Sequence, residues 1–236
     1  MAVAVAAVAS AQPAATQPSV LTTPPDYSAF GESVTIPFAR STHFGDLRRM
    51  DVRISINGSK PMQFLVDTGS VGMVVGASVL KPEDIAPDAP ADSITYSSSG
   101  VVLEGVRTPL TLTFVDSKGP DGKPVSATVP VLVAQRRRVL PGAVNSSTRP
   151  ASTQPMTNPK PFMLGIGFDR GREPKQEYNP FVNLDAMVKG TMRRGYTIMR
   201  EGFTLGLTKK SVGDGYLFQQ LRPRTPSCKW PPPGRG

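Results

Sequence analysis

The fold of this 236-residue chain is decided by one stretch, Phe64-Leu65-Val66-Asp67-Thr68-Gly69-Ser70. An apolar run leads straight into the carboxylate of Asp67, and Gly69 permits a sharp turn just after it. Thr68 and Ser70 place two hydroxyls beside the carboxylate, and both can donate hydrogen bonds to it. A second apolar run follows, so the acid lies at the tip of a tight loop between two predicted strands. Because such an acid is costly unless it is hydrogen-bonded or used chemically, Asp67 is the first candidate catalytic residue.

The segments around this stretch have the patterns of short strands. Residues 50–56 alternate apolar and polar side chains, which indicates a half-buried strand. Asn57-Gly58, the strongest short hairpin pattern, comes next, and residues 62–66 return as the partner strand. Further strands are predicted at 33–38, 93–96, 101–106, 110–115, 125–134, 195–200 and 203–207, and one helix at 180–189 with Asn179 as its cap. The 25 prolines and 22 glycines suit many short strands joined by turns, so the predicted fold class is mostly β with one or two short helices.

Three segments, in order along the chain, resemble the pepsin-like aspartic proteases. The segment 52–75, with its hairpin, apolar strand and Asp67-Thr68-Gly69-Ser70, is similar to the first active-site loop of that family. The segment 93–100 is similar to the family's flap, a hairpin whose tyrosine, here Tyr96, closes over the substrate. The run Phe162-Met163-Leu164-Gly165 resembles the two-hydrophobics-then-glycine element that threads behind the catalytic loop.

The resemblance covers about residues 36–208 and implies one lobe, of the N-terminal type, of the pepsin-like fold. Such a lobe is a folded-over sheet or partial closed barrel. Residues 195–207 also look like the family's strands at the junction between lobes. The shorter retropepsins, which become active by pairing two copies, share the loop and the hydrophobic-glycine element more distantly. In length the region is nearer to one lobe of the two-lobed enzymes.

The resemblance also implies an activity, the hydrolysis of peptide bonds by a water activated between two carboxylates that share a proton. The ionised carboxylate acts as general base and the protonated one polarises the scissile carbonyl, with no metal or other cofactor. The residues implied for catalysis are Asp67, Thr68, Gly69 and Ser70. Those implied for substrate binding are Tyr96, Ser97 and Gly100, and those implied to support the site are Met163, Leu164 and Gly165.

The second carboxylate that this chemistry needs is not recognisable in the sequence. No other Asp-Thr-Gly or Asp-Ser-Gly occurs, Asp214 lacks a preceding apolar strand, and Asp169 fits a loop acid. Three explanations stay open: a second lobe absent from this chain, a homodimer in which two copies of Asp67 meet, or a non-catalytic peptide-binding or structural protein on the same fold. The expected partners are accordingly a peptide or protein substrate and a second lobe or second copy.

The charged residues and the rare residue types exclude several other classes of function. The formal net charge is +9, and its densest cluster, Arg136-Arg137-Arg138, is interpreted as a solvated loop. Because no aromatic residues interleave with it and no nucleic-acid motif accompanies it, no nucleic-acid partner is predicted. Cys228 and His43 are the sole residues of their types, which excludes an intramolecular disulfide and a cysteine- or histidine-based metal cluster. A Ser-His-Asp triad would need His43 as its base.

The two ends of the chain differ in composition from its middle. Residues 1–11 are nearly all Ala and Val and resemble the remnant of a secretory signal, so export to the periplasm or the extracellular space is expected. Residues 12–32 are a predicted disordered linker, 33–208 the protease-like lobe, and 209–236 an irregular tail or the truncated start of a second lobe. Apart from residues 1–11, no stretch approaches the length needed to span a bilayer.

Overall fold

The computed structural model of the chain describes residues 26–39, 50–96, 99–140, 156–157, 162–167, 176–211 and 216–218. All of these residues belong to one compact unit, Asp26–Gln220. A second unit, Met1–Pro25 together with Leu221–Gly236, contains none of the described residues. The expected signal remnant and most of the expected linker and tail therefore lie outside the described residues.

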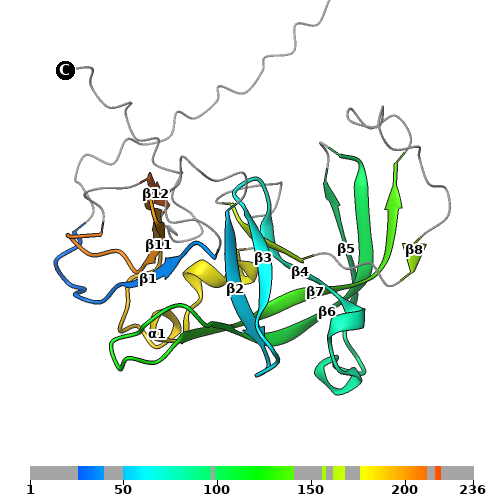
Figure 1. Cartoon of the computed structure of the whole chain (residues 1–236), viewed down its shortest axis with the longest axis horizontal. Coiled ribbons are helices and arrows are strands. Elements are labelled where there is room, and N and C mark those ends of the chain that lie inside the picture. The colour runs from blue at the N-terminus through cyan, green and yellow to red at the C-terminus, as the bar shows by residue number, and fades with distance from the viewer. Residues whose placement is uncertain are drawn as a thin grey trace, which may run out of the picture. The chain divides into compact units, whose positions relative to one another are not determined.

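The described residues form two β-sheets, whose strands are labelled in Figure 1. The larger sheet has the spatial order β5 (Ala91–Tyr96), β6 (Val101–Phe114), β2 (Asp51–Ile56), β3 (Met62–Asp67), β9 (Phe162–Ile166), β4 (Val71–Gly76), β7 (Val125–Val139) and β8 (Met156–Thr157). The smaller sheet has the order β1 (Val34–Pro37), β11 (Gly202–Leu205), β10 (Tyr196–Ile198) and β12 (Tyr216–Phe218).

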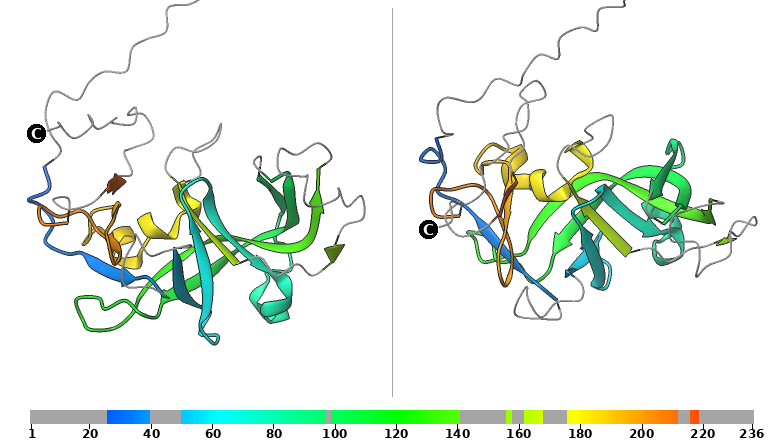
Figure 2. Two further views of the ribbon diagram at one scale, coloured as in Figure 1. Left: turned by 45° about the horizontal axis from the view of Figure 1, so that its top comes forward. Right: turned by 90° about the horizontal axis from the view of Figure 1, so that it is seen from above.

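The larger sheet is partly closed into a ring. β6 pairs with β7 from Val101 opposite Val139 to Phe114 opposite Val125, so the pairings run β6-β2-β3-β9-β4-β7 and back to β6. The β3–β9 and β4–β7 pairs are parallel and the other pairs of the ring are antiparallel. Both views of Figure 2 show the long strands β6 and β7 curving along their length. The prediction of a mostly β fold with a partly closed sheet is confirmed.

One irregularity in β6 has a clear steric cause. The register between β6 and β7 shifts between Glu104 and Gly105, which marks a β-bulge. A Cβ at Gly105 would lie 1.9 Å from the carbonyl oxygen of Val133, so only glycine permits the two backbones to approach this closely. A bulge bends its strand and increases the local twist, which helps a long strand to follow the ring.

β6 is one continuous strand, although the sequence predicts two strands at 101–106 and 110–115. Pro109, which lies between the two predicted strands, is opposite Pro130 of β7. This point of β6 lies between Val106, where its pairing with β5 ends, and Leu112, where its pairing with β2 begins. A proline has no N–H to donate, and it is tolerated here because no second neighbouring strand needs that donor.

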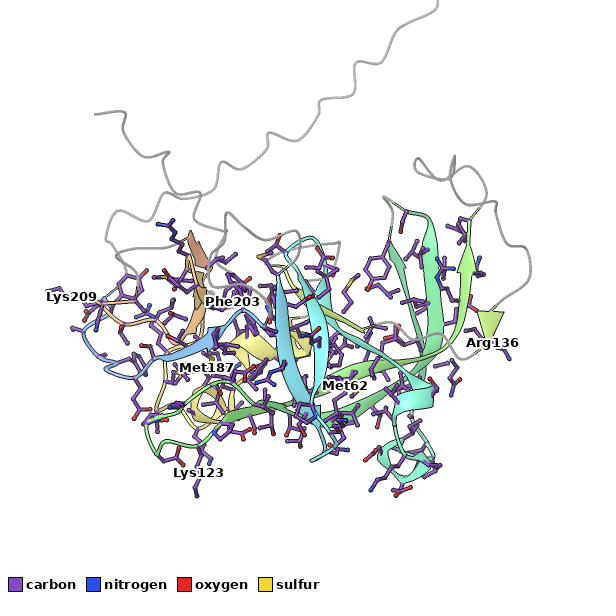
Figure 3. The ribbon with its side chains drawn as sticks, in the orientation of Figure 1. Met62, Lys123, Arg136, Met187, Phe203 and Lys209 are labelled. Carbon is purple, nitrogen blue, oxygen red and sulfur yellow. The ribbon has the colours of Figure 1, made fainter. Side chains whose placement is uncertain are left out.

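The arginine cluster Arg136-Arg137-Arg138 lies in β7, so its interpretation as a loop is wrong. Backbone partners on β6 hold this part of the strand, and Arg138 Nε donates a hydrogen bond to Glu104 Oε1 at 2.8 Å. Figure 3 shows Arg136 close to β8, with which it is paired through Thr157. A charge pattern by itself gives no sign of such cross-strand partners, and for that reason the predicted strand at 125–134 stopped short of the cluster.

Two other strands also depart from the sequence prediction. β2 does not alternate cleanly, because Ser55 is buried together with its apolar neighbours and Arg53 is its exposed residue. This follows from its place between β3 and β6 in the ring. Beyond residue 208, where only an irregular chain was predicted, β12 pairs with β10.

The helical segments are short. The predicted helix at 180–189 is split into a 3₁₀ turn, η6 (Pro180–Val182), and the α-helix α1 (Asp185–Val188). Asn179 caps η6 as predicted, because its Oδ1 accepts a hydrogen bond from the backbone N–H of Phe181 at 3.0 Å. The remaining 3₁₀ turns are η2 (Ala77–Val79), η3 (Pro82–Asp84) and η5 (Gln176–Tyr178). No helix in the described ranges combines the length and apolar character needed to cross a bilayer.

The hydrophobic core is shared by the ring and the smaller sheet. The aromatic ring of Phe181 makes edge-to-face contacts with the rings of Phe114, Tyr196 and Phe203, at centroid distances of 5.6, 5.4 and 5.0 Å. Figure 3 marks Phe203 on β11 and Met187, a further member of this buried cluster, on α1. The ring that carries the Asp67 loop is therefore packed against the smaller sheet through one continuous core.

Candidate active site

Asp67 is the last residue of β3, and the turn after it, residues 67–70, is called the Asp67 loop below. Its Oδ1 accepts a hydrogen bond from the backbone N–H of Gly69, and its Oδ2 accepts one from the Ser70 hydroxyl, both at 2.7 Å. The two donors fix the orientation of the carboxylate. The hydroxyl of Thr68 makes no hydrogen bond within the described part of the chain.

β9 passes between the two strands that the Asp67 loop connects. It runs parallel to β3, with Gly165 opposite Asp67, and antiparallel to β4, with Gly165 opposite Gly72. A Cβ on Gly165 would lie 2.7 Å from the Ser70 hydroxyl oxygen and 2.8 Å from the Gly72 carbonyl oxygen, so the crossing requires glycine. The end of β9 is also bonded to the Asp67 loop, because the N–H of Gly167 donates a hydrogen bond to the Ser70 carbonyl oxygen at 2.7 Å.

The three residues expected to support the site all lie in β9. Leu164 is fully buried and Met163 is half-buried, on either side of the strand, and Gly165 makes the close approach described above. Leu164 lies opposite Val66 of β3, the residue before Asp67. β9 therefore supplies both the apolar packing and the backbone partners that hold the Asp67 loop.

A second element brings Tyr96 towards Asp67. We call β5, its turn and residues 101–106 of β6 the Tyr96 hairpin. Tyr96 ends β5 opposite Val101, and its carbonyl oxygen accepts a hydrogen bond from the N–H of Gly100 at 2.8 Å, which closes the turn. Gly100 has a φ of 63°, a conformation that glycine adopts without strain. Ser97, the third residue expected to bind substrate, lies outside the described residues.

The phenol of Tyr96 is in an apolar environment and within the field of Asp67. Burial raises the pKa of Tyr96 well above its usual value, and the negative charge of Asp67 raises it further. The Tyr96 hydroxyl oxygen is inaccessible to solvent and has no hydrogen-bond partner in the described residues. The structure therefore brings together two of the predicted site residues, Asp67 and Tyr96, that are remote in sequence.

An apolar cluster packs around Tyr96, separate from the main core. Its buried members are Val74, Leu103, Leu132 and Ala134, and the half-buried members packed on them are Ile94, Tyr96 and Val101. The cluster packs the Tyr96 hairpin against β7 and against β4, the strand that follows the Asp67 loop in the sequence. It forms an apolar wall around the ring of Tyr96.

The carbonyl oxygen of Ile166, at the end of β9, accepts two buried hydrogen bonds that sequence reasoning missed. One comes from Asn179 Nδ2 at 3.1 Å and the other from the Tyr196 hydroxyl. Asn179 was predicted only as a helix cap, and its second role depends on β9 being threaded next to η6. No local pattern in the sequence could have revealed either contact.

No second carboxylate is seen next to Asp67 in the described residues. Asp169 and Asp214, the two other acids weighed from the sequence, lie outside those residues. The described residues also contain no group of three or more His, Cys, Asp or Glu side chains able to hold a metal ion. The arrangement as described offers one oriented carboxylate, one apolar wall and one buried phenol.

Comparison with known proteins adds no relative to this picture. No protein-family model matches the chain, and no curated protein is similar to it at a significant level. The chemistry of the site has to be inferred from its own residues.

Proposed function

We propose that this chain is a pepsin-like lobe of an aspartic-type peptidase, in which Asp67 is one of two carboxylates that activate a water for attack on a peptide bond. The observation that carries the proposal is the carboxylate of Asp67. It ends a strand, is oriented by Gly69 and Ser70, and lies in electrostatic range of Tyr96 on a separate hairpin. The threading of β9 between β3 and β4 supports the same proposal, because it braces the loop from behind.

Each group has a definite task in this chemistry. The ionised carboxylate of the pair takes a proton from the water while the water oxygen bonds to the carbonyl carbon. The protonated carboxyl gives its proton to the carbonyl oxygen, and the tetrahedral intermediate collapses as a proton moves to the leaving amine. Ser70 and the Gly69 N–H hold the Asp67 carboxylate in a fixed orientation. Tyr96 and the apolar wall exclude bulk water, which strengthens the electrostatic interactions inside.

The second carboxylate is proposed to come from a second lobe or from a second copy of the chain. Two carboxylates held close together cannot both ionise, so the partner raises one pKa of the pair and makes the acid and base roles distinct. The resemblance to the pepsin-like proteases implies a matching role for Thr68. Its hydroxyl makes no hydrogen bond within the described residues and would contact the corresponding residue of the partner lobe.

A second candidate function is the binding of peptides without cleavage. It is favoured by two features of the described residues. The candidate site has one carboxylate with no second one seen next to it, and the Tyr96 hydroxyl has no hydrogen-bond partner and lies within an apolar cluster. Such a cluster offers an apolar contact to the side chains of an extended peptide. This reading also assumes an exported protein, as the residues at 1–11 suggest.

The experiment that separates the two is a cleavage assay with a matched pair of variants. The chain as expressed, and the protein purified from its natural source, are incubated with a peptide pool between about pH 3 and 7, a span that brackets carboxyl pKa values. Asp67→Asn should abolish cleavage, whereas Asp88→Asn, at an exposed position in a turn, should leave it unchanged. Native mass measurement then assigns the second carboxylate to a second copy or to a longer chain.

Two outcomes would contradict the enzymatic proposal. One is cleavage that persists in Asp67→Asn. The other is the absence of any cleavage in protein from the natural source while peptides still bind, which would support the binding function instead.

A further inference from the structure

Arg107 lies at the base of the Tyr96 hairpin and holds it in three places. Its backbone N–H donates to the carbonyl oxygen of Pro90 at 2.9 Å, just before β5 begins. Its Nε donates to Asp92 Oδ2 on β5, in an ion pair whose side chains are only 13% and 27% exposed for Arg107 and Asp92. Its Nη1 donates to the carbonyl oxygen of Pro130 on β7 at 3.3 Å. An ion pair so well shielded is less weakened by solvent than a surface pair.

The flat face of the same guanidinium lies over Tyr178 of η5. The Arg107 Cζ atom is 4.1 Å from the centroid of the Tyr178 ring, within the range of a cation–π contact. Tyr178 in turn is packed against Gly72, because its Cβ lies 3.1 Å from the position that a Cβ of Gly72 would occupy. Gly72 has a φ of +92°, so this contact fixes a backbone conformation that other residues adopt only with strain.

From Gly72 the contacts continue to the candidate catalytic group. Gly72 is paired with Gly165, and Gly165 is paired with Asp67. Gly165 also abuts Ser70, whose hydroxyl donates to the Asp67 carboxylate. A chain of direct contacts therefore runs from the base of the Tyr96 hairpin, through Tyr178, to the back of the Asp67 loop.

We propose that Arg107 is a positioning residue that holds the Tyr96 hairpin and the Asp67 loop in one fixed relation. Its guanidinium does two things at once, pairing edge-on with Asp92 of the hairpin and stacking face-on with Tyr178 behind the loop. Lysine carries the same charge but has no planar face and no fixed fork, so it cannot do both. In this proposal the distance from Tyr96 to Asp67 is set by residues other than the candidate catalytic and substrate-binding ones.

The consequence for catalysis rests on the proposed function, while the coupling itself does not. If a peptide is clamped between Tyr96 and Asp67, a small displacement of the hairpin moves the scissile carbonyl away from the activated water. Misplacement of about 1 Å can cost on the order of 100-fold in rate. The coupling is therefore measured first in the unliganded protein, and the catalytic effect second.

The first measurement is hydrogen exchange of the backbone amides at neutral pH, together with the ¹⁹F spectrum of protein labelled with fluorotyrosine, in which Tyr96→Phe assigns the Tyr96 resonance. Arg107→Lys and Tyr178→Leu should each speed exchange in residues 91–106 by about tenfold or more and shift the Tyr96 resonance. Tyr178→Phe keeps the aromatic face and should preserve both observables. The matched charge control is Arg53→Lys on β2, which alters the ion pair between Arg53 and Asp116 and should change neither observable.

The proposal is overturned if exchange in residues 91–106 and the Tyr96 resonance stay as in the parent protein in both Arg107→Lys and Tyr178→Leu. It is also overturned if exchange rises equally in β2, β3, β10 and β11, because that result means a general loss of stability. Should Tyr178→Leu fail to fold, Arg107→Lys and Asp92→Asn carry the same test, since each removes one of the two linked contacts.

The second measurement is made on the peptidase once its second carboxylate has been assigned. Arg107→Lys should lower kcat/KM by on the order of 100-fold, through both a lower kcat and a raised KM, and leave the two pKa values of the rate profile in place, because these belong to the carboxylate pair. A general loss of folded enzyme would instead lower the apparent kcat at constant KM. A parent protein without activity would refute the proposed function and leave the exchange result to decide the coupling.

Discussion

At the scale of single residues, the negative charge of Asp67 raises the pKa of Tyr96, although no hydrogen bond joins the two side chains in the described residues. The phenol is surrounded by Ile94, Val101 and the apolar residues beneath them, and an ionised phenolate there would face the Asp67 carboxylate. Both effects favour the neutral phenol, burial more strongly than the charge. The Tyr96 hydroxyl therefore keeps its proton over the whole physiological pH range.

The raised pKa of Tyr96 predicts how stability changes in alkali. In the unfolded chain the phenol ionises near its usual pKa of about 10, whereas in the folded chain it stays neutral to higher pH. Above pH 10 the unfolded state therefore binds fewer protons, and the free energy of unfolding falls as pH rises. Tyr96→Phe should make this fall shallower by up to about 1.4 kcal/mol per pH unit. Urea unfolding at pH 9, 10 and 11 measures the slope.

Tyr196 provides an internal check on that expectation. Its pKa is also raised by burial, so Tyr196→Phe should flatten the same slope, although it removes the hydrogen bond to Ile166 and lowers stability at every pH. Slopes that are identical in the parent and in Tyr96→Phe would show that the phenol is exposed in solution.

At the scale of elements, β9 is the strand on which the site depends. A strand can pass between β3 and β4 only if its backbone approaches the Asp67 loop more closely than a side chain allows. Gly165 meets that condition, because its missing Cβ leaves room for the Ser70 hydroxyl and the Gly72 carbonyl. Leu164 on the same strand is buried in the core. The strand therefore needs a residue without a side chain at position 165 and a large apolar side chain at position 164.

Gly165→Ala should therefore be strongly destabilising. The new methyl group would lie 2.7 Å from the Ser70 hydroxyl oxygen and 2.8 Å from the Gly72 carbonyl oxygen, which forces the loop and strand apart. We expect a loss of about 2 to 3 kcal/mol in the free energy of unfolding, measured by urea titration. Gly31→Ala is the matched control, since nothing lies within 4 Å of its Cβ position, and it should change stability by no more than about 0.5 kcal/mol. Equal effects of the two variants would argue against the threading of β9.

At the scale of the whole folded unit, closure of the ring and one shared core should make folding cooperative. Phe181 contacts aromatic residues of β6, β10 and β11, so it connects the ring to the smaller sheet. Neither sheet could keep its apolar face buried if the other came away, because both contribute to the same buried cluster. The unit Asp26–Gln220 is expected to unfold in one transition.

Phe181→Ala tests this cooperativity. It should lower the free energy of unfolding by about 3 to 5 kcal/mol, the usual range for a buried phenylalanine, and move the whole transition as one. Val188→Ala, at a side chain that is 62% exposed, should change it by less than about 0.5 kcal/mol. Far-ultraviolet circular dichroism and tyrosine fluorescence recorded in the same urea series report the two sheets together, and transitions that separate in Phe181→Ala would show two independently folding parts.

Much of the fold was predictable because its determinants are local. Three segments each specify a local conformation through a few neighbouring residues: the turn Asn57-Gly58, the apolar run into Asp67, and the two hydrophobic residues before Gly165. Strands β1, β3, β10 and β11 begin and end close to their predicted bounds for the same reason. β6 and β7 were predicted less well, because a partner strand overrides the local preferences of Pro109 and of the arginine cluster.

The sequence by itself determined much of the strand pattern and the turn at Asp67-Thr68-Gly69-Ser70. Only the tertiary structure decided that β9 lies between β3 and β4, that Tyr96 lies in the field of Asp67, and that Arg107 joins the hairpin to the back of the loop. The physical reason is range. Turn and strand preferences act over a few residues, whereas close approach, burial and electrostatic coupling arise between segments that only the closed ring brings together.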